Sequence, residues 1–152
     1  MLLEKFLVEA ENSGIEIREH AFKNLQLKGL YVDNVVTINS NISTNAEKIC
    51  VIAEEIGHHH TSIGNILDQS DILNRKQEKR ARTWAYQKLI PLSSFVQAHR
   101  HGIKNKYELA EYLGVTESFL EETIKRYQEI YGLCTIVNGF TICFDPLGVL
   151  ED

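Results

Sequence analysis

The sequence predicts an α+β fold, and three observations support this prediction. Apolar residues recur at helical spacing over residues 45–61 and again over residues 74–90, as in helices that pack against a core. Stretches rich in β-branched and aromatic residues flank the pairs Asp33-Asn34 and Asn138-Gly139, and such pairs favour tight hairpin turns. The chain also lacks an internal repeat or a low-complexity segment, so we expect its elements to form one body.

The first 44 residues are expected to form a helix followed by strands. The helix covers residues 2–13 and ends at Gly14, after which residues 14–22 alternate as a short strand or turn does. Residues 27–44 contain the Asp33-Asn34 pair between two β-branched runs, which predicts two short strands joined by a tight turn. We expect the strand over residues 35–38 to offer an edge on which an extended peptide pairs.

A long helix is expected to begin after Thr44, which opens the capping box T-N-A-E. In such a box the hydroxyl of Thr44 and the carboxylate of Glu47 accept hydrogen bonds from backbone donors at the start of the helix. Apolar side chains share one face of this helix; they are Ala46, Ile49, Cys50, Ala53 and Ile56. The helix over residues 45–61 should therefore pack against the core and carry three histidines at its far end.

The second half of the chain is predicted to be mostly helical. Residues 61–74 are rich in polar and turn-forming types, and the helix over residues 74–90 stops before Pro91. A short helix capped by a serine follows and ends at Gly102, and two more helices lie on either side of residues 114–116. A terminal β-hairpin completes the chain.

Composition argues against a membrane protein and against nucleic acid as a partner. No apolar stretch approaches the roughly 18 to 20 residues of a membrane span, and the opening MLLEKFLVEAENSG carries acids where a signal peptide is basic. We therefore expect a cytoplasmic protein. The formal net charge of -5, from 21 acids and 16 Lys plus Arg, gives no general attraction for a phosphate backbone.

Three cysteines, Cys50, Cys134 and Cys143, lie within apolar runs and lack CxxC spacing. Small apolar side chains of this kind are usually buried, and disulfides are rare in the cytoplasm. We therefore expect all three to be buried, reduced thiols.

The segment that carries chemistry is A-E-E-I-G-H-H-H, residues 53–60. Residues four apart share a helix face, so Glu54 and His58 are able to hold one metal ion while Glu55 reaches a water on that ion. This is the spacing of the H-E-x-x-H pattern with glutamate in the first position. Carboxylate and imidazole both bind zinc at about 2.0 to 2.2 Å, so the exchange is chemically permissible.

A metal site on one helix needs a third protein ligand from elsewhere, and Glu78 is the candidate. It lies on the second long helix, where Ala81 and Ala85 follow it and make a stripe of small residues. Such a stripe lets two helices approach closely, and an acid buried there without a partner would be costly. We therefore expect Glu78 to face the first long helix and complete the ligand set.

The two segments together resemble the ImmA/IrrE family of metallopeptidases. That family shows H-E-L-G-H and, further along, a glutamate, an aromatic residue flanked by small residues, and a proline; here E-E-I-G-H-H is followed by E-K-R-A-R-T-W-A-Y-Q-K-L-I-P. The second segment matches at Glu78, Trp84 and Pro91, while Arg82 stands where asparagine is frequent. The similarity extends over residues 29–39 and more loosely over 108–115, so it covers most of the chain.

The resemblance implies a zincin-like, zinc-dependent metallopeptidase. Glu54 and His58 match the two ligand positions, Glu78 the downstream acidic ligand and Glu55 the general base. Zinc is the first expectation and manganese the reserve, because oxygen ligands favour harder metals. The resemblance also implies a phage or prophage origin and a protein substrate that is a repressor of a phage or mobile element.

On this interpretation the chain is a single metallopeptidase domain over residues 1–152. Residues 1–91 form the metal-binding core, residues 92–132 a helical subdomain like a helix-turn-helix, and residues 133–152 the terminal hairpin. The oligomeric state does not follow from the sequence.

Other interpretations of the same residues stay open. Glu55 and His59 are also four apart and would form the metal-gripping pair in a shifted register, and the histidines would also suit a solvated helix end facing the negative pole of the helix. A DNA-binding regulator built on residues 108–127 is the runner-up function, although the second helix of that unit is mainly acidic. A metal-binding adaptor without activity is the third.

Overall fold

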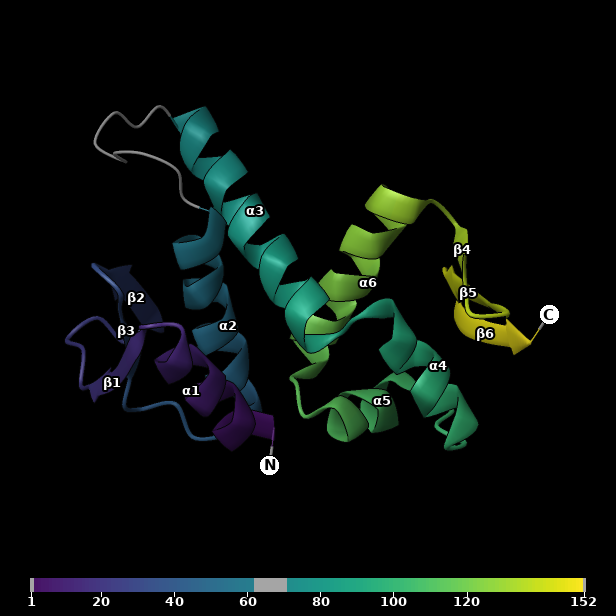
Figure 1. The fold of residues 1–152 in the computed structure, drawn as a ribbon, viewed down its shortest axis with the longest axis horizontal. Helices are drawn as coiled ribbons and strands as arrows, with labels where there is room; N and C mark the ends of the chain where they lie inside the picture. The colour runs from purple at the N-terminus through teal and green to yellow at the C-terminus, as the bar shows by residue number, and fades with distance from the viewer. Residues whose placement is uncertain (1, 62–70, 152) are drawn as a thin grey trace. The chain divides into compact units, whose positions relative to one another are not determined.

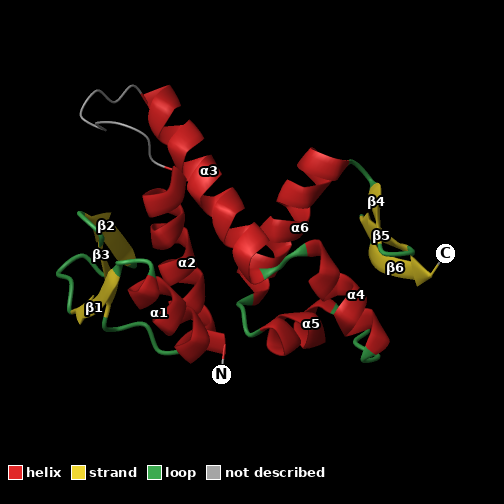
Figure 2. Cartoon of the chain, viewed as in Figure 1, coloured by secondary structure: helices red, strands yellow, loops and turns green. Residues whose placement is uncertain are grey.

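The structure, a computed structural model, describes residues 2–61 and 71–151. The predicted α+β fold is confirmed: the described residues form six helices and two three-stranded sheets (Figures 1 and 2). The chain divides into two compact units, Met1–Ala85 and Tyr86–Asp152. The single-domain expectation stays a prediction, and the turn-rich stretch expected between the long helices lies largely on residues outside the described ranges. No helix within the described ranges has the length and apolar character of a membrane span.

The first unit holds a sheet in the order β1-β3-β2. Strands β2 (Gly29–Val32) and β3 (Val35–Asn39) form the predicted antiparallel hairpin. At its turn Asp33 and Asn34 have φ values of 47° and 64°, and two consecutive positive φ values are what a two-residue type I′ turn requires. Strand β1 (Glu16–His20) pairs with the other side of β3 in parallel.

This strand order corrects the expected peptide-binding edge. Strand β3, which contains residues 35–38, lies in the centre of the sheet with Val36 and Ile38 buried, so both of its edges are already paired. The sequence indicates the β2–β3 hairpin, but it does not indicate that β1 covers the second edge of β3, because β2 lies between these two strands in the sequence. The edges of this sheet are β1 and β2.

Helix α1 (Leu2–Asn12) ends as predicted before Gly14, whose φ is 82°. Helix α2 (Asn45–Thr61) begins with the expected cap, since the backbone N–H of Glu47 donates to Thr44 Oγ1 at 3.2 Å. The carboxylate of Glu47 lies 3.4 Å from Lys28 Nζ. The cap therefore fixes the start of α2, while the glutamate side chain ties it to the segment before β2.

Figure 1 shows α1 and α2 lying beside the first sheet, with α3 (Asp71–Leu89) alongside α2. The buried residues of α2 are Ile49, Cys50, Ile52, Ala53, Ile56 and Gly57. Four of the five residues predicted for this face are among them, and Ala46 is half-buried. The apolar face of α2 therefore anchors the helix that carries the candidate site.

The second unit begins with helix α4 (Leu92–Arg100). The predicted serine cap is wrong: the N-cap residue is Pro91, with a φ of -61° and no side-chain cap, and Ser94 is buried inside the helix. Proline fits a helix start because its ring fixes φ and its missing N–H would have no partner there. The predicted end at Gly102 agrees with the structure, in which Gly102 follows the helix with a φ of 76°.

Helices α5 (Lys106–Leu113) and α6 (Glu117–Tyr131) are separated by the predicted turn. Gly114 ends α5 with a φ of 74°, and Thr116 caps α6 by accepting from the backbone N–H of Phe119 at 3.2 Å. The hydroxyl of Tyr127 in α6 donates to the carbonyl of Ile90 at 2.6 Å. Likeness of this unit to a DNA-binding helix-turn-helix stays a prediction.

The chain ends in an antiparallel sheet of β4 (Cys134–Val137), β5 (Phe140–Phe144) and β6 (Leu147–Glu151). The hairpin predicted at Asn138-Gly139 is confirmed, with φ values of 50° and 81° at its turn. Strand β6 was not predicted. Its Leu147-Gly148 start carries a glycine and follows a proline, a composition that argues for a turn more than for a strand.

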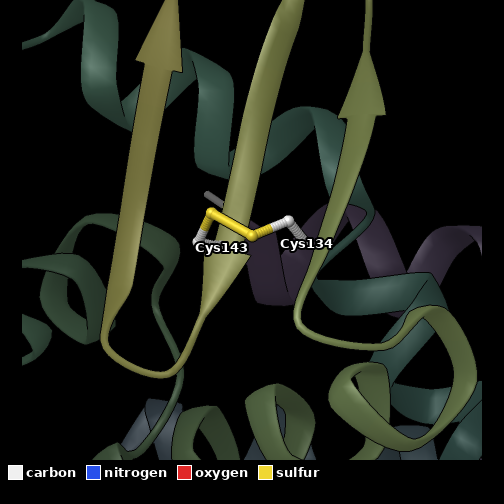
Figure 3. Close-up of a disulfide and its surroundings, with 2 residues drawn as sticks. All are labelled: Cys134 and Cys143. Carbon is white, nitrogen blue, oxygen red and sulfur yellow. A yellow bond between two sulfur atoms is a disulfide. The ribbon is translucent and has the colours of Figure 1, made fainter.

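The prediction of three reduced, buried cysteines is wrong for two of them. Cys134 and Cys143 form a disulfide between β4 and β5 (Figure 3). They stand directly opposite each other with Cα atoms 4.1 Å apart, a separation that places two side chains of one sheet face in contact. Cys134 is exposed, whereas Cys50 is buried and takes part in no disulfide, as expected.

Candidate functional site

Helices α2 and α3 approach each other closely at Gly57. A Cβ atom built on Gly57 would lie 3.0 Å from the carbonyl carbon of Ala81, so only glycine fits against the backbone of α3. Ala81 and Ala85 are completely buried, which confirms the predicted stripe of small residues. Nearly one turn further along α2, the ring of His60 stacks on that of Trp84, with ring centroids 4.7 Å apart. The two helices are therefore held at a fixed separation beside the candidate ligands.

The close approach brings together two of the predicted ligands. His58 Nε2 lies 3.2 Å from Glu78 Oε1, although the two residues come from different helices. A hydrogen bond at this distance requires a proton on Nε2, which is also the nitrogen that an imidazole commonly offers to a metal. The side chain of His58 is largely covered, whereas that of Glu78 is half-exposed, so the pair is reachable from solvent.

Glu55 lies on the side of α2 that faces strand β2. A Cβ on Gly29 would lie 3.1 Å from Glu55 Cγ and 2.7 Å from a methyl carbon of Val51, so β2 passes directly over this face of α2. The pKa of Glu55 is raised from 4.5 to about 7, chiefly by burial and to a smaller extent by the negative charges of Glu78 and Glu54. A carboxyl with a pKa near neutrality is well suited to accept and return a proton.

Tyr31, two residues further along β2, contacts the same face of α2. Its hydroxyl lies 2.5 Å from His59 Nδ1 and 3.2 Å from Asn34 Oδ1. One hydroxyl has one proton, so it donates to one of these atoms and accepts from the other, which requires either the Nδ1–H form of His59 or the flipped amide of Asn34. The bond engages His59 with the sheet, whereas His58 faces Glu78; this arrangement favours the unshifted register of the motif.

Sequence reasoning did not single out Gly29 or Tyr31. The available signal was the glycine within a strand, which often marks a close approach of another element. Residues two apart in a strand share a face, so Gly29 and Tyr31 both point toward α2, where Glu55 and His59 lie one helical turn apart. Two residues along β2 therefore correspond to one turn of α2, so the strand lies along the helix.

The fourth predicted residue, Glu54, is half-buried on α2, one turn before His58. Its charge acts on Glu55, as does that of Glu78, so the three carboxylates share one neighbourhood. Over residues 2–61 and 71–151, however, no group of three His, Cys, Asp or Glu side chains is gathered closely enough to hold a metal ion. The structure thus brings His58 and Glu78 together and leaves the complete ligand set as a prediction.

The raised pKa of Glu55 predicts a pH-dependent stability of the metal-free protein. Because the folded state binds this proton more tightly than the unfolded chain, its contribution is full below pH 4.5 and is lost as the pH rises to about 7. A pKa difference of this size corresponds to about 3 kcal/mol. In the presence of a chelator, Glu55→Gln should therefore raise the unfolding free energy relative to wild type by more at pH 8 than at pH 5, as measured by urea denaturation.

The control for this measurement is Glu121→Gln, which changes an exposed carboxylate of α6. Its unfolding free energy relative to wild type should be the same at both pH values. Equal effects of Glu55→Gln at pH 5 and pH 8 would show that this carboxyl is ordinary in the folded state.

Comparison with known families agrees with this arrangement. The peptidase family M78 model, which describes the IrrE N-terminal-like domain, matches residues 10–125. No curated protein matches the chain at a significant level. The matched range contains α2, α3 and all of the residues discussed above, and it covers well over half of the chain. The chain therefore belongs to the IrrE N-terminal-like peptidase family, as its resemblance to ImmA/IrrE proteins predicts, and this membership supports a metallopeptidase type of function.

Proposed function

We propose that this protein is a metal-dependent endopeptidase. Glu54, His58 and Glu78 hold a divalent metal ion, and Glu55 is the general base. The observation that carries the proposal is the 3.2 Å distance between His58 Nε2 and Glu78 Oε1. The two residues belong to motifs that lie apart in the sequence and on different helices, and this contact brings the motifs together. Membership of a peptidase family supports the same assignment.

The donor set suits a divalent cation. Two carboxylates and one neutral imidazole offset its charge, and both donor types bind zinc. The pKa of Glu55 is raised mainly by burial and also by the carboxylates of Glu78 and Glu54, and a cation among the three carboxylates would relieve the repulsion between them. Zinc is the proposed metal, and the two oxygen ligands make manganese the reserve.

The proposed chemistry is hydrolysis of a peptide bond. When bound, the metal ion supplies a Lewis acid that polarises the scissile carbonyl and acidifies a water. Glu55 accepts the proton of the attacking water and then returns it to the leaving amine. Glu55 lies beside the backbone of Gly29, so the proposed proton transfer would take place next to strand β2.

Strand β2 is the proposed binding edge for the peptide, in place of the central strand β3. In an antiparallel hairpin the paired residues alternate, and Lys28 accepts a hydrogen bond from Asn39 N at 2.8 Å. Residues 28, 30 and 32 therefore bond to β3, while the backbone groups of Gly29 and Tyr31 point away from it. An extended peptide would pair with these two residues, next to Glu55.

The finer biological assignment rests on the family resemblance alone. We propose an enzyme of phage or prophage origin whose protein substrate is a repressor of a phage or mobile element. A DNA-binding role gains no support from α6, whose exposed residues include Glu117, Glu121 and Glu122. These acids would face phosphates of like charge.

Metal content tests the proposal directly. The full chain purified without chelator should hold about one zinc or manganese ion, because three protein ligands and an open position make one site. His58→Ala and Glu78→Ala should each lose most of this metal, measured by elemental analysis after gel filtration. His101→Ala, which removes an exposed histidine of the second unit, is the matched control and should retain it.

Other outcomes of the same experiment have different meanings. Loss of metal from His59→Ala together with retention by His58→Ala would establish the shifted register. A wild-type chain that takes up neither zinc nor manganese would overturn the metallopeptidase proposal. A metal-loaded chain that cleaves no peptide would instead support the third interpretation, a metal-binding adaptor without activity.

A further inference from the structure

A cavity of about 500 Å³ lies within the second unit, and neither the proposed peptidase site nor the family assignment accounts for it. Its walls come from the end of α4, the loop before α5, the first turns of α5 and the turn between β5 and β6. The volume falls within the roughly 300 to 1,000 Å³ that small-molecule sites occupy. All lining residues belong to residues 95–149, so the cavity is a property of this unit alone.

The floor of the cavity is apolar and firmly packed. Phe95 and Phe144 line it, and both are only 2% exposed. Their ring centroids are 6.4 Å apart, and Tyr127 packs edge-on against both rings. Leu109 of α5 completes this surface and is also buried. These packed side chains fix the floor, and the half-exposed Ile103, Leu147 and Val149, which also line the cavity, offer the apolar surface to a ligand.

The rim of the cavity is basic, in a protein whose net charge is -5. Lys104, Lys106 and His99 line it, and Asp145 is the one acidic residue among the lining residues. Within the described part of the chain, neither lysine takes part in an ion pair. The rim therefore has a positive charge that a ligand of opposite sign would complement.

Helix α5 adds to the same electrostatic preference. Its N-cap residue Asn105 also lines the cavity, and its side chain accepts from the backbone N–H of Glu108 at 2.8 Å. The cap orients the first turn of α5 so that the positive end of its dipole lies at the rim. The charge of Glu108 opposes this effect, although that residue does not line the cavity. The lysines and the floor, more than the helix end, therefore decide the ligand.

We propose that this cavity binds a small amphipathic carboxylate, a molecule with one carboxylate group and an aliphatic or aromatic body. The body contacts the apolar lining of Ile103, Leu147 and Val149, and the carboxylate meets Lys104 and Lys106. An inorganic anion would leave the apolar floor in contact with water, and a neutral apolar molecule would leave the lysines without a counter-charge. The inference does not depend on the peptidase assignment.

Titration of the full chain with hexanoate and octanoate tests this proposal by amide NMR shifts. Saturable shifts should appear at residues 98–109 and 144–149. Octanoate should bind about 16-fold more tightly than hexanoate, because it has two more methylenes and each buried methylene contributes about fourfold. Octanamide, which keeps the chain and removes the charge, should bind about fivefold more weakly than octanoate.

Two variants separate the site from general charge effects. The double variant Lys104→Glu/Lys106→Glu should weaken octanoate binding at least about tenfold and should prefer octylamine. Lys125→Glu, at an exposed position of α6, is the control and should bind octanoate as wild type does. If the charge reversal disturbs folding, judged by circular dichroism, Lys104→Gln/Lys106→Gln should still weaken octanoate binding while leaving octanamide unchanged.

Three results would overturn the proposal. They are the absence of saturable shifts around the cavity, equal affinities for hexanoate and octanoate, and an equal loss of octanoate binding in Lys125→Glu and the double variant. The last result would indicate attraction to the protein surface in general and no specific site.

Discussion

Glu55→Gln is expected to lower the rate of peptide cleavage by about 10²- to 10⁴-fold, the usual contribution of a positioned general base. Glutamine keeps the shape of the side chain but accepts no proton at neutral pH. Because Glu55 is not one of the proposed ligands, the metal content of the variant should equal that of wild type. The two measurements together separate a lost base from a lost metal site.

Cleavage is best followed by mass spectrometry of a mixed peptide library, since the preferred sequence is unknown. Glu47→Gln is the matched control, because it removes a carboxylate from the same helix about two turns earlier and should leave the rate unchanged. Undiminished cleavage by Glu55→Gln would reject this residue as the base and would also reject the shifted register, in which Glu55 is a metal ligand.

Gly57→Ala is expected to destabilise the protein by about 1 to 3 kcal/mol, although alanine in a helix interior is ordinarily better than glycine by about 1 kcal/mol. The new methyl group would meet the backbone carbonyl of Ala81, which is completely buried and, unlike the end of a flexible side chain, cannot turn aside. Relief of the overlap requires α2 and α3 to separate, and this separation would also draw His58 away from Glu78. We therefore expect weaker metal binding as well as a lower urea midpoint.

The control for this substitution is Gly148→Ala, because no atom lies within 4 Å of a Cβ built at Gly148. Its unfolding free energy should stay within about 0.5 kcal/mol of wild type. A stabilised Gly57→Ala variant would mean that propensity outweighs the contact and that the two helices are not tightly apposed.

The helices and hairpins that carry the site were predictable because their signals are local. The pair Asp33-Asn34 and the capping box at Thr44 each act over a few residues, and the structure has the turn and the helix start where the sequence places them. The approach of His58 to Glu78 was likewise predictable from two short motifs, because the spacing of small residues on α3 already specifies which face can approach α2, whereas the complete ligand set stays a prediction.

The features that were missed depend on which distant segments become neighbours. Strand β1 pairs with β3 across the intervening hairpin, and this pairing moves the free edge from β3 to β2. The pairing of Cys134 with Cys143 follows from the register of β4 on β5, which apolar composition alone does not specify. The contact of Tyr31 with His59 needs both the strand order and the direction of β2 along α2.

The shortness of strand β2 limits how selective such an enzyme would be through backbone pairing. Four residues span about 13 Å, and only two of them turn their amide groups outward. At about 1 kcal/mol net for each hydrogen bond, an extended chain held only by that edge would dissociate in the millimolar range or above. Discrimination of one cellular protein from another would consequently have to come from side-chain contacts or from surfaces distant from the scissile bond.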